Sequence, residues 1–185
     1  PDMNVQTAVV LAAGEGTRLQ PLTDNRPKPM LPAANRPILE YVLDALVDAG
    51  LERIVLVVGY RRDRVQNAIG PSYRDVPVKY VIQQKQLGSG HALAQASAAV
   101  SGPPLVVNGD RLIEADSVRN VIETFESDDS PAAMAVIERE EPSRYGVVSL
   151  EGDRVVELIE KPGTAESQLI NAGSYAFEQS IFDEI

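Results

Sequence analysis

The segment Leu11–Pro32, LAAGEGTRLQPLTDNRPKPMLP, combines two closely spaced glycines with several cations and four prolines. Gly14 and Gly16 would let the backbone approach a ligand closely, so that successive N–H groups can surround a phosphate. Arg18 and Lys28 add positive charge, and the prolines beside Lys28 stiffen the loop that carries it. These residue types in this order predict a binding site for a phosphate-bearing ligand.

The residue types and their spacing argue against two familiar phosphate-binding motifs and against two kinds of catalytic centre. GEGTR is not a P-loop, because no Gly-Lys-Ser/Thr follows it. A dehydrogenase-like dinucleotide binder is disfavoured, since Leu19 stands where the third glycine of that fingerprint belongs. The chain has no cysteine, which excludes disulfides and thiolate metal sites. Its only histidine, His91, is expected to be a polar residue at a helix start rather than a catalytic base.

The elements that would position these residues alternate between apolar strands and amphipathic helices. Short apolar runs predict buried strands at Thr7–Ala12, Arg53–Val58, Val78–Ile82 and Leu105–Asn108. The helices expected with them run from Pro37, as the first helical residue, to a stop at Gly50, and over Asp63–Ile69, Ala92–Val100 and Asp116–Phe125. This order is typical of a Rossmann-like α/β fold, a mostly parallel sheet with helices on both faces.

Such sheets bind ligands at the carboxyl ends of their strands. Leu11–Pro32 leaves the first predicted strand and Asn108–Asp110 leaves the fourth, so the two segments should meet at one edge of the sheet. After Pro131 the pattern changes to short strands separated by turns, which predicts an antiparallel extension. Its strands are expected within AAMAVI, YGVVSL, RVVELIEK and NAGSYAF.

Composition limits the class of protein. A chain of 185 residues with 44% hydrophobic residues is expected to form one globular domain. The net charge of −10 argues against nucleic acid as a partner. No apolar run is long enough to cross a membrane and no signal peptide is visible, so we expect a cytoplasmic protein without a membrane partner. Residues 12–36 nevertheless carry an excess of basic residues, which favours an anionic ligand over solvent-facing cations on a structural turn.

Several motifs together resemble the sugar-1-phosphate nucleotidyltransferases. The motifs are LAAGEGTRLQPLT with RPKPMLP and NRPIL, then QQKQLGSGHA, NGD, YGVV with IEKP, and NAGSYAF, in the family's order. QQKQLGSGHA is most similar to the form found in N-acetylglucosamine-1-phosphate uridylyltransferases. Members of the family join a nucleoside triphosphate to a sugar-1-phosphate and release pyrophosphate. The resemblance extends over nearly the whole chain.

The resemblance implies a role for each matched residue. Those that would hold the nucleotide are Leu11, Ala12, Ala13, Gly14, Gly16 and Thr17. The catalytic residues would be Arg18 and Lys28, beside the phosphates, and Asp110, as the ligand of Mg²⁺. A pyrimidine edge would be read by Gln83 and the Gly88 backbone, with Ser89 beside them. The sugar would contact Gly146, Glu160 and Asn171, with Lys161 near its phosphate.

The physical chemistry of the reaction suits these roles. Bringing a triphosphate to a second phosphate means overcoming a repulsion worth several kcal/mol at intermediate dielectric. Phosphoryl-type transfer therefore depends on positioning and charge neutralisation more than on covalent help. Mg²⁺ often takes one or two carboxylates together with substrate phosphates, which suits a single aspartate such as Asp110. The sugar phosphate is itself the ionised nucleophile, so no general base is needed.

We therefore expect UTP or dTTP as donor, a sugar-1-phosphate as acceptor and Mg²⁺ as cofactor, and self-association into a homo-oligomer stays open. One alternative is a catalytically silent nucleotide-sugar-binding regulatory domain on the same fold, against which the presence of Arg18, Lys28 and Asp110 argues. Another is transfer to a non-sugar phosphate, against which the motifs EKP and NAG argue.

Family members continue beyond the position of Ile185 and supply a second metal-binding Asp or Asn from that later segment. QSIFDEI, at Gln179–Ile185, is expected to form the first turns of a helix. The expectation is thus that residues 1–185 are a nucleotidyltransferase domain truncated at its C-terminus, with poor turnover of its own.

Overall fold

The structure is a computed structural model that describes residues 4–127 and 129–185. Its centre consists of four strands: β1 (Thr7–Leu11), β4 (Arg53–Val58), β6 (Val76–Ile82) and β7 (Pro104–Asn108). They are parallel to one another in the order β7-β1-β4-β6. Valine, isoleucine and leucine dominate β1, β4 and β7 because both faces of these three strands are buried. The predicted parallel core is confirmed.

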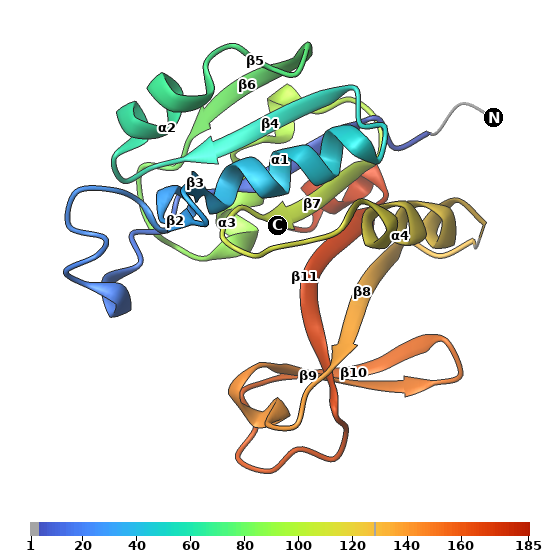
Figure 1. Cartoon of the computed structure of the whole chain (residues 1–185). Helices are drawn as coiled ribbons and strands as arrows, with labels where there is room; N and C mark the ends of the chain where they lie inside the picture. The colour runs from blue at the N-terminus through green and yellow to red at the C-terminus, as the bar shows by residue number, and fades with distance from the viewer. Residues whose placement is uncertain (1–3, 128) are drawn as a thin grey trace.

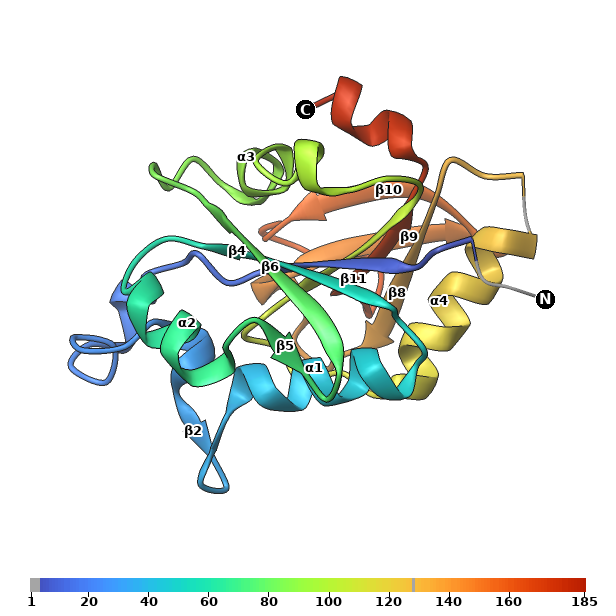
Figure 2. The same cartoon turned by 90° about the horizontal axis from the view of Figure 1, so that it is seen from above.

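Helices cover both faces of this parallel core (Figure 2). They are α1 (Ile38–Asp48), α2 (Arg62–Ile69), α3 (Ser89–Ala94) and α4 (Ala115–Ser127). Successive side chains of a strand point to opposite faces. Ala8 and Val10 accordingly pack in one apolar cluster with α1, α2 and α4, whereas Val9 packs in a second cluster with α3.

The predicted antiparallel extension is also confirmed. It consists of β8 (Ala132–Glu138), β9 (Gly146–Glu151), β10 (Arg154–Glu160) and β11 (Leu169–Phe177). β11 pairs with β7 of the core and with β8 and β9, while β10 pairs only with β9 among the described residues. The extension therefore projects from the core (Figure 1), and β11 connects the two regions.

Three predicted boundaries were wrong. Pro37 belongs to the short strand β3 (Arg36–Pro37), which pairs with β2 (Pro32–Ala33), and α1 begins one residue later. The helix expected over Ala92–Val100 is instead α3 followed by the 3₁₀ turn η3 (Ser97–Ala99). Gly88 has a φ of 99°, which lets the chain turn into the helix earlier than its alanines suggest. Near the end of the chain the expected helical turns form the 3₁₀ helix η5 (Gln179–Asp183).

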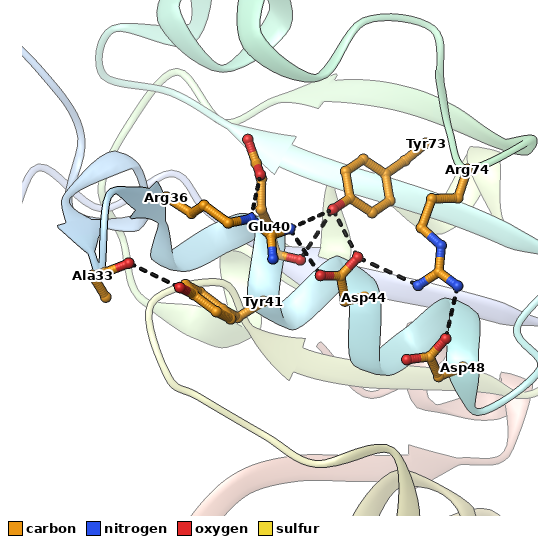
Figure 3. A network of polar contacts seen from close by, with 8 residues as sticks. All are labelled: Ala33, Arg36, Glu40, Tyr41, Asp44, Asp48, Tyr73 and Arg74. Carbon is orange, nitrogen blue, oxygen red and sulfur yellow. Dashed lines mark hydrogen bonds and ion pairs between the residues drawn. The ribbon is translucent and has the colours of Figure 1, made fainter.

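A polar network fastens the segment after Lys28 to the core (Figure 3). Arg36 of β3 contacts Asp44 of α1 at 2.8 Å. Tyr73 of β5 (Ser72–Tyr73) donates a hydrogen bond to the same carboxylate at 2.9 Å, and Arg74 contacts Asp48 at 2.9 Å. Burial, with the neighbouring Asp44 carboxylate, raises the pKa of Tyr73 to about 12. The network thus links the β2–β3 hairpin, α1 and β5.

No helix among the described residues is long and apolar enough to cross a membrane.

Candidate active site

A cavity of about 570 Å³ lies at the carboxyl ends of the parallel strands. We call it the glycine-loop cavity. Among its lining residues are the following predicted ones: Leu11, Ala13, Gly14, Gly16, Thr17, Arg18, Lys28, Gln83, Gly88, Ser89 and Asp110. Ala12 does not line it, because its side chain is buried and its backbone N–H donates to the Val57 carbonyl at 2.9 Å. Segments distant in the sequence therefore meet at one sheet edge, as expected.

A second cavity of about 470 Å³ lies between the core and the extension. We call it the extension cavity. The remaining predicted residues line it: Gly146, Glu160, Lys161 and Asn171. The two cavities share Leu11, Ser89 and Asn108 as lining residues, so they are neighbours along one wall.

The glycine loop packs against the segment that carries Lys28. Gly16 has a φ of 65°, and a Cβ atom there would lie 3.0 Å from the Cβ of Lys28. Thr23 is buried and donates its hydroxyl hydrogen to the Gly16 carbonyl at 2.8 Å. At Gly14, by contrast, a Cβ would meet no atom of the described chain within 4 Å, which leaves room for a ligand beside the loop. Packing thus fixes the backbone at Gly16, whereas the space beside Gly14 is open to a ligand.

Lys28 and Asp110 form an ion pair on the wall of the glycine-loop cavity, with 2.7 Å between Nζ and Oδ2. Both side chains are partly exposed, and such pairs contribute only about 0–1 kcal/mol to stability. The pair can therefore exchange partners with an ionic ligand at little cost. The described residues contain no group of three or more His, Cys, Asp or Glu that could hold a metal. One carboxylate beside the glycine loop still fits Mg²⁺, a cation that commonly takes its other ligands from substrate phosphates and water.

Gln83 is only 3% exposed, and its amide is held in place. Its Nε2 donates to the Gly88 carbonyl at 3.2 Å and lies 3.0 Å from Nδ1 of His91. Three residues after Gln83, Gln86 donates from Nε2 to the Ala13 carbonyl at 2.7 Å and so joins this loop to the glycine loop. Gln86 was not among the predicted site residues, although Gln86 lies inside the QQKQLGSGHA motif.

Gly59 is a second residue that sequence reasoning missed, and its role is steric. A Cβ atom at this position would lie 2.9 Å from the Gln83 carbonyl oxygen and 3.1 Å from that of Ala13. Contacts below 3.0 Å with backbone atoms require the backbone to shift. The absence of a side chain at Gly59 is what lets the two loops approach each other. No sequence signal separates this glycine from others that follow a strand.

In the extension cavity, Asn171 is fixed from three sides. Its Nδ2 donates to the hydroxyl of Tyr175, and its Oδ1 accepts from the N–H of Gly173 at 2.8 Å. Arg111 donates from Nη1 to the Asn171 carbonyl at 2.7 Å. Burial raises the pKa of the Tyr175 hydroxyl, so that group stays protonated at neutral pH. Arg111, Tyr175 and Asn108 line the cavity but were not predicted to do so.

The side chains of Glu160, the last residue of β10, and of Lys161 directly after it are held more loosely than that of Asn171. Glu160 and Lys161 form an ion pair of 3.4 Å and are 67% and 52% exposed. A Cβ atom on Gly146 would lie 3.1 Å from Oε2 of Glu160, so this glycine leaves space for that carboxylate.

A cationic glycine loop, an aspartate at a strand end and a second cavity under the antiparallel extension thus lie along one edge of a parallel α/β core. The profile of the family described as "Nucleotidyl transferase" matches residues 7–185. The chain belongs to this enzyme family, as the sequence motifs led us to expect.

Two relatives are similar to this chain in sequence. The chain is 39% identical over 178 residues to the UTP–glucose-1-phosphate uridylyltransferase AglF of Haloferax volcanii, covering 95% of this chain and 73% of AglF. It is 38% identical over 179 residues to the bifunctional protein GlmU of Methanococcus maripaludis, covering 95% of this chain. The chain spans only 41% of the length of that GlmU.

Solved structures agree with the fold. A putative glucose-1-phosphate thymidylyltransferase from Bacillus anthracis, solved in complex with a sucrose, superposes with a TM-score of 0.89 at 25% identity, covering 96% of this chain and 73% of that chain. A UDP-glucose pyrophosphorylase complexed with UDP-glucose superposes with a TM-score of 0.86 at 26% identity, covering 97% and 78%.

Proposed function

We propose that this domain transfers a nucleotidyl group from UTP or dTTP to a sugar-1-phosphate, giving an NDP-sugar and pyrophosphate. The observation that carries the proposal is the adjacency of the two cavities. The glycine-loop cavity contains the residues that suit a nucleoside triphosphate, the extension cavity those that suit a sugar phosphate, and they share a wall at Leu11, Ser89 and Asn108. The names of the relatives, which include a UTP–glucose-1-phosphate uridylyltransferase, support the same reaction.

On this proposal the glycine-loop cavity holds the triphosphate. The backbone N–H groups around Gly14 and Gly16 approach the phosphates, and Arg18 and Lys28 neutralise charge beside them. Gln83 and the Gly88 backbone meet the base. Asp110 would be the protein ligand of Mg²⁺, which when bound supplies two positive charges against the phosphates. Lys28, which is paired with Asp110 in this structure, could exchange that partner for a phosphate at little cost.

The extension cavity would orient the acceptor. Gly146, Glu160 and Asn171 contact the sugar in this proposal, and Lys161 lies near its phosphate. An oxygen of that phosphate attacks the α-phosphorus of the nucleotide and forms the new P–O bond. The bond between the α-phosphorus and the bridging oxygen breaks, and pyrophosphate leaves with the electron pair. No proton has to move at the attacking oxygen, so the protein contributes positioning and charge.

The test is a matrix of UTP, dTTP, CTP, ATP and GTP against several sugar-1-phosphates, an alditol phosphate and choline phosphate, with Mg²⁺, read by pyrophosphate release. Calorimetric binding of each nucleotide and of the corresponding nucleotide sugars is measured on the same protein. We expect release with UTP or dTTP and a hexose-1-phosphate. Nucleotide-sugar binding without release under any pairing would instead indicate the silent regulatory domain, and release only with an alditol or choline phosphate would indicate the non-sugar acceptor.

The proposal has two further parts. A cytoplasmic location is proposed from the proposed substrates, since nucleoside triphosphates are made there. Self-association is proposed for β10, a strand whose outer edge has no partner in the described chain and whose Val156 and Leu158 are 50% and 47% exposed. Light scattering over a range of protein concentrations measures it.

A further inference from the structure

His91, the only histidine of the chain, contacts the residue that the proposed function assigns to the base. It is the third residue of α3, and its ring is partly buried. Its Nδ1 atom lies 3.0 Å from Nε2 of Gln83. The same Nε2 atom donates to the Gly88 carbonyl at 3.2 Å. His91 itself is not among the residues that line the glycine-loop cavity, so it reaches a ligand there only through Gln83.

A count of hydrogens decides the orientation of the Gln83 amide. Orientations of amides and imidazoles are assigned from the hydrogen-bond network, and here the network favours one assignment. The Gly88 carbonyl can only accept, and it also accepts from the N–H of Ala92 at 3.1 Å. Turning the amide over would place Oε1 of Gln83 against that carbonyl, with two acceptors facing each other. Nε2 therefore points inward, and one of its two hydrogens is used by Gly88.

The second hydrogen of Nε2 points to His91. The contact is a hydrogen bond only if Nδ1 is the unprotonated, accepting nitrogen, which places the ring hydrogen of neutral His91 on Nε2. Gln95 also approaches the ring, with 3.5 Å between its Nε2 and Nε2 of His91. That distance is at the outer limit of a hydrogen bond, and the Gln95 amide donates to the His91 carbonyl at 3.3 Å instead. The accepting nitrogen of the His91 ring is therefore Nδ1, and it accepts from Gln83.

This arrangement limits what Gln83 can offer to a base. With both Nε2 hydrogens engaged, Oε1 is the atom of the amide that can pair with a ligand, and it can only accept. Uracil and thymine carry an N–H donor at N3, whereas cytosine carries an acceptor at the same position. We propose that His91 is a positioning residue that holds Gln83 with its acceptor toward the base, and that the site thereby selects uracil or thymine over cytosine. The proposal rests on the proposed function in taking Gln83 as the base-reading residue.

The first experiment needs neither ligand nor turnover. Because the chain has a single histidine, nitrogen-15 NMR of protein without a histidine tag reports one imidazole without further assignment. At mildly alkaline pH we expect the tautomer protonated at Nε2, with Nδ1 shifted as a hydrogen-bond acceptor. We also expect Gln83→Ala to remove that shift. Protonation at Nδ1, or a spectrum unchanged by Gln83→Ala, would overturn the proposal.

The second experiment measures base selectivity as the ratio of UTP to CTP dissociation constants, with Mg²⁺ present. Two acceptors facing each other in a buried site lower affinity by roughly tenfold to hundredfold, which is the preference for UTP expected of the wild-type protein. His91→Ala should move the ratio toward one, because the amide is then held only by the Gly88 carbonyl. His91→Asn should keep most of it, because the Oδ1 of asparagine can accept where Nδ1 does. Both variants lose the ring, so a merely structural role would affect them equally.

The outcomes separate this inference from the proposed function. A preference that is unchanged in His91→Ala, that is reduced equally in His91→Asn, or that is absent from the wild-type protein overturns the role of His91. If the wild-type protein binds UTP selectively and His91→Ala reduces the selectivity, but no sugar-1-phosphate supports pyrophosphate release, the proposed function fails and the role of His91 stands.

Discussion

In the parallel core, β1, β4 and β7 are buried along almost their whole length, whereas in the extension every residue of β10 is exposed. The walls of the two cavities differ in the same way. Around the glycine-loop cavity, loops are held by buried contacts such as Thr23 to Gly16 and by the close approach at Gly59. Around the extension cavity, β10 and the residue after it contribute the half-exposed pair Glu160 and Lys161.

We infer that the core forms its half of the site before a ligand arrives, while the β10 wall of the other half adjusts to its ligand. Preorganised charge lowers a barrier most, because it needs no rearrangement as the transition state forms. Side chains that must be ordered on binding contribute mainly to affinity and selectivity. Mutations in the two cavities should therefore differ in which kinetic constant they change.

The largest effect is expected from Arg18→Ala. Loss of the Arg18 charge, which the proposed function places beside the reacting phosphates, should lower kcat by about two to three orders of magnitude and change nucleotide affinity much less. Steady-state kinetics and calorimetry measure the two quantities. Arg26→Ala is the matched control, since Arg26 lies in the same region but is exposed and does not line the cavity. Near-normal turnover of Arg18→Ala at saturating substrate would contradict the assignment.

Gly59→Ala should have the next largest effect. Its Cβ would push apart the backbones of Ala13 and Gln83, and overpacking of this kind costs about 1–3 kcal/mol. We expect UTP affinity to fall by roughly tenfold or more, because the loops separate before the nucleotide binds. Gly163→Ala is the control, because a Cβ at Gly163 meets no atom of the described chain within 4 Å. Equal UTP affinity in both variants would show that the loops are not preformed.

Glu160→Gln tests the extension by itself. Removing one charged hydrogen-bonding group should raise the KM for the sugar-1-phosphate by roughly tenfold. UTP affinity should stay unchanged, because Glu160 lines only the extension cavity of the two. Glu157→Gln on the same exposed strand serves as the control. A parallel loss of UTP affinity would mean that the two halves of the site are coupled more tightly than their packing indicates.

The smallest effect concerns stability at alkaline pH. The pKa of Tyr73 is raised from 10.0 to about 12 in the folded chain. The folded state then keeps a proton that the unfolded state loses, so the free energy of unfolding should fall as the pH rises from about 10 towards 12. Tyr73→Phe should flatten part of this slope in urea unfolding curves.

The sequence predicted the core better than the details of the site, for physical reasons. Apolar runs such as that of β4 show their burial directly, and their boundaries were accurate. The helix over Ala92–Val100 was misplaced because alanine content signals helical propensity, whereas the start of α3 depends on the backbone turn at Gly88. Propensity is a weak guide where a single φ angle decides.

Residues that line the candidate site were predicted where their own side chain or backbone has a recognisable chemical role, and missed where they act through a neighbour. Arg18 and Asp110 belong to motifs with a chemical signature of their own. His91, Gln86 and Arg111 form hydrogen bonds to residues of those motifs, and such partners become visible only when the fold brings them together. A glycine such as Gly59 matters through the atoms opposite it, about which the sequence says nothing.

The register of β8 and β11 has a consequence for how acceptor specificity can diversify. Leu169 pairs with Glu138, and the N–H of Arg139 donates to the Gln168 carbonyl at 2.9 Å. The two ends of segment 139–168 therefore lie side by side, and this segment carries Gly146, Glu160 and Lys161. The corresponding segment of a relative could therefore replace residues 139–168 without a change in the backbone around the glycine-loop cavity. On the proposed function, the acceptor contacts of Gly146, Glu160 and Lys161 can thus change through replacement of thirty consecutive residues, while Asn171 on β11 stays in place.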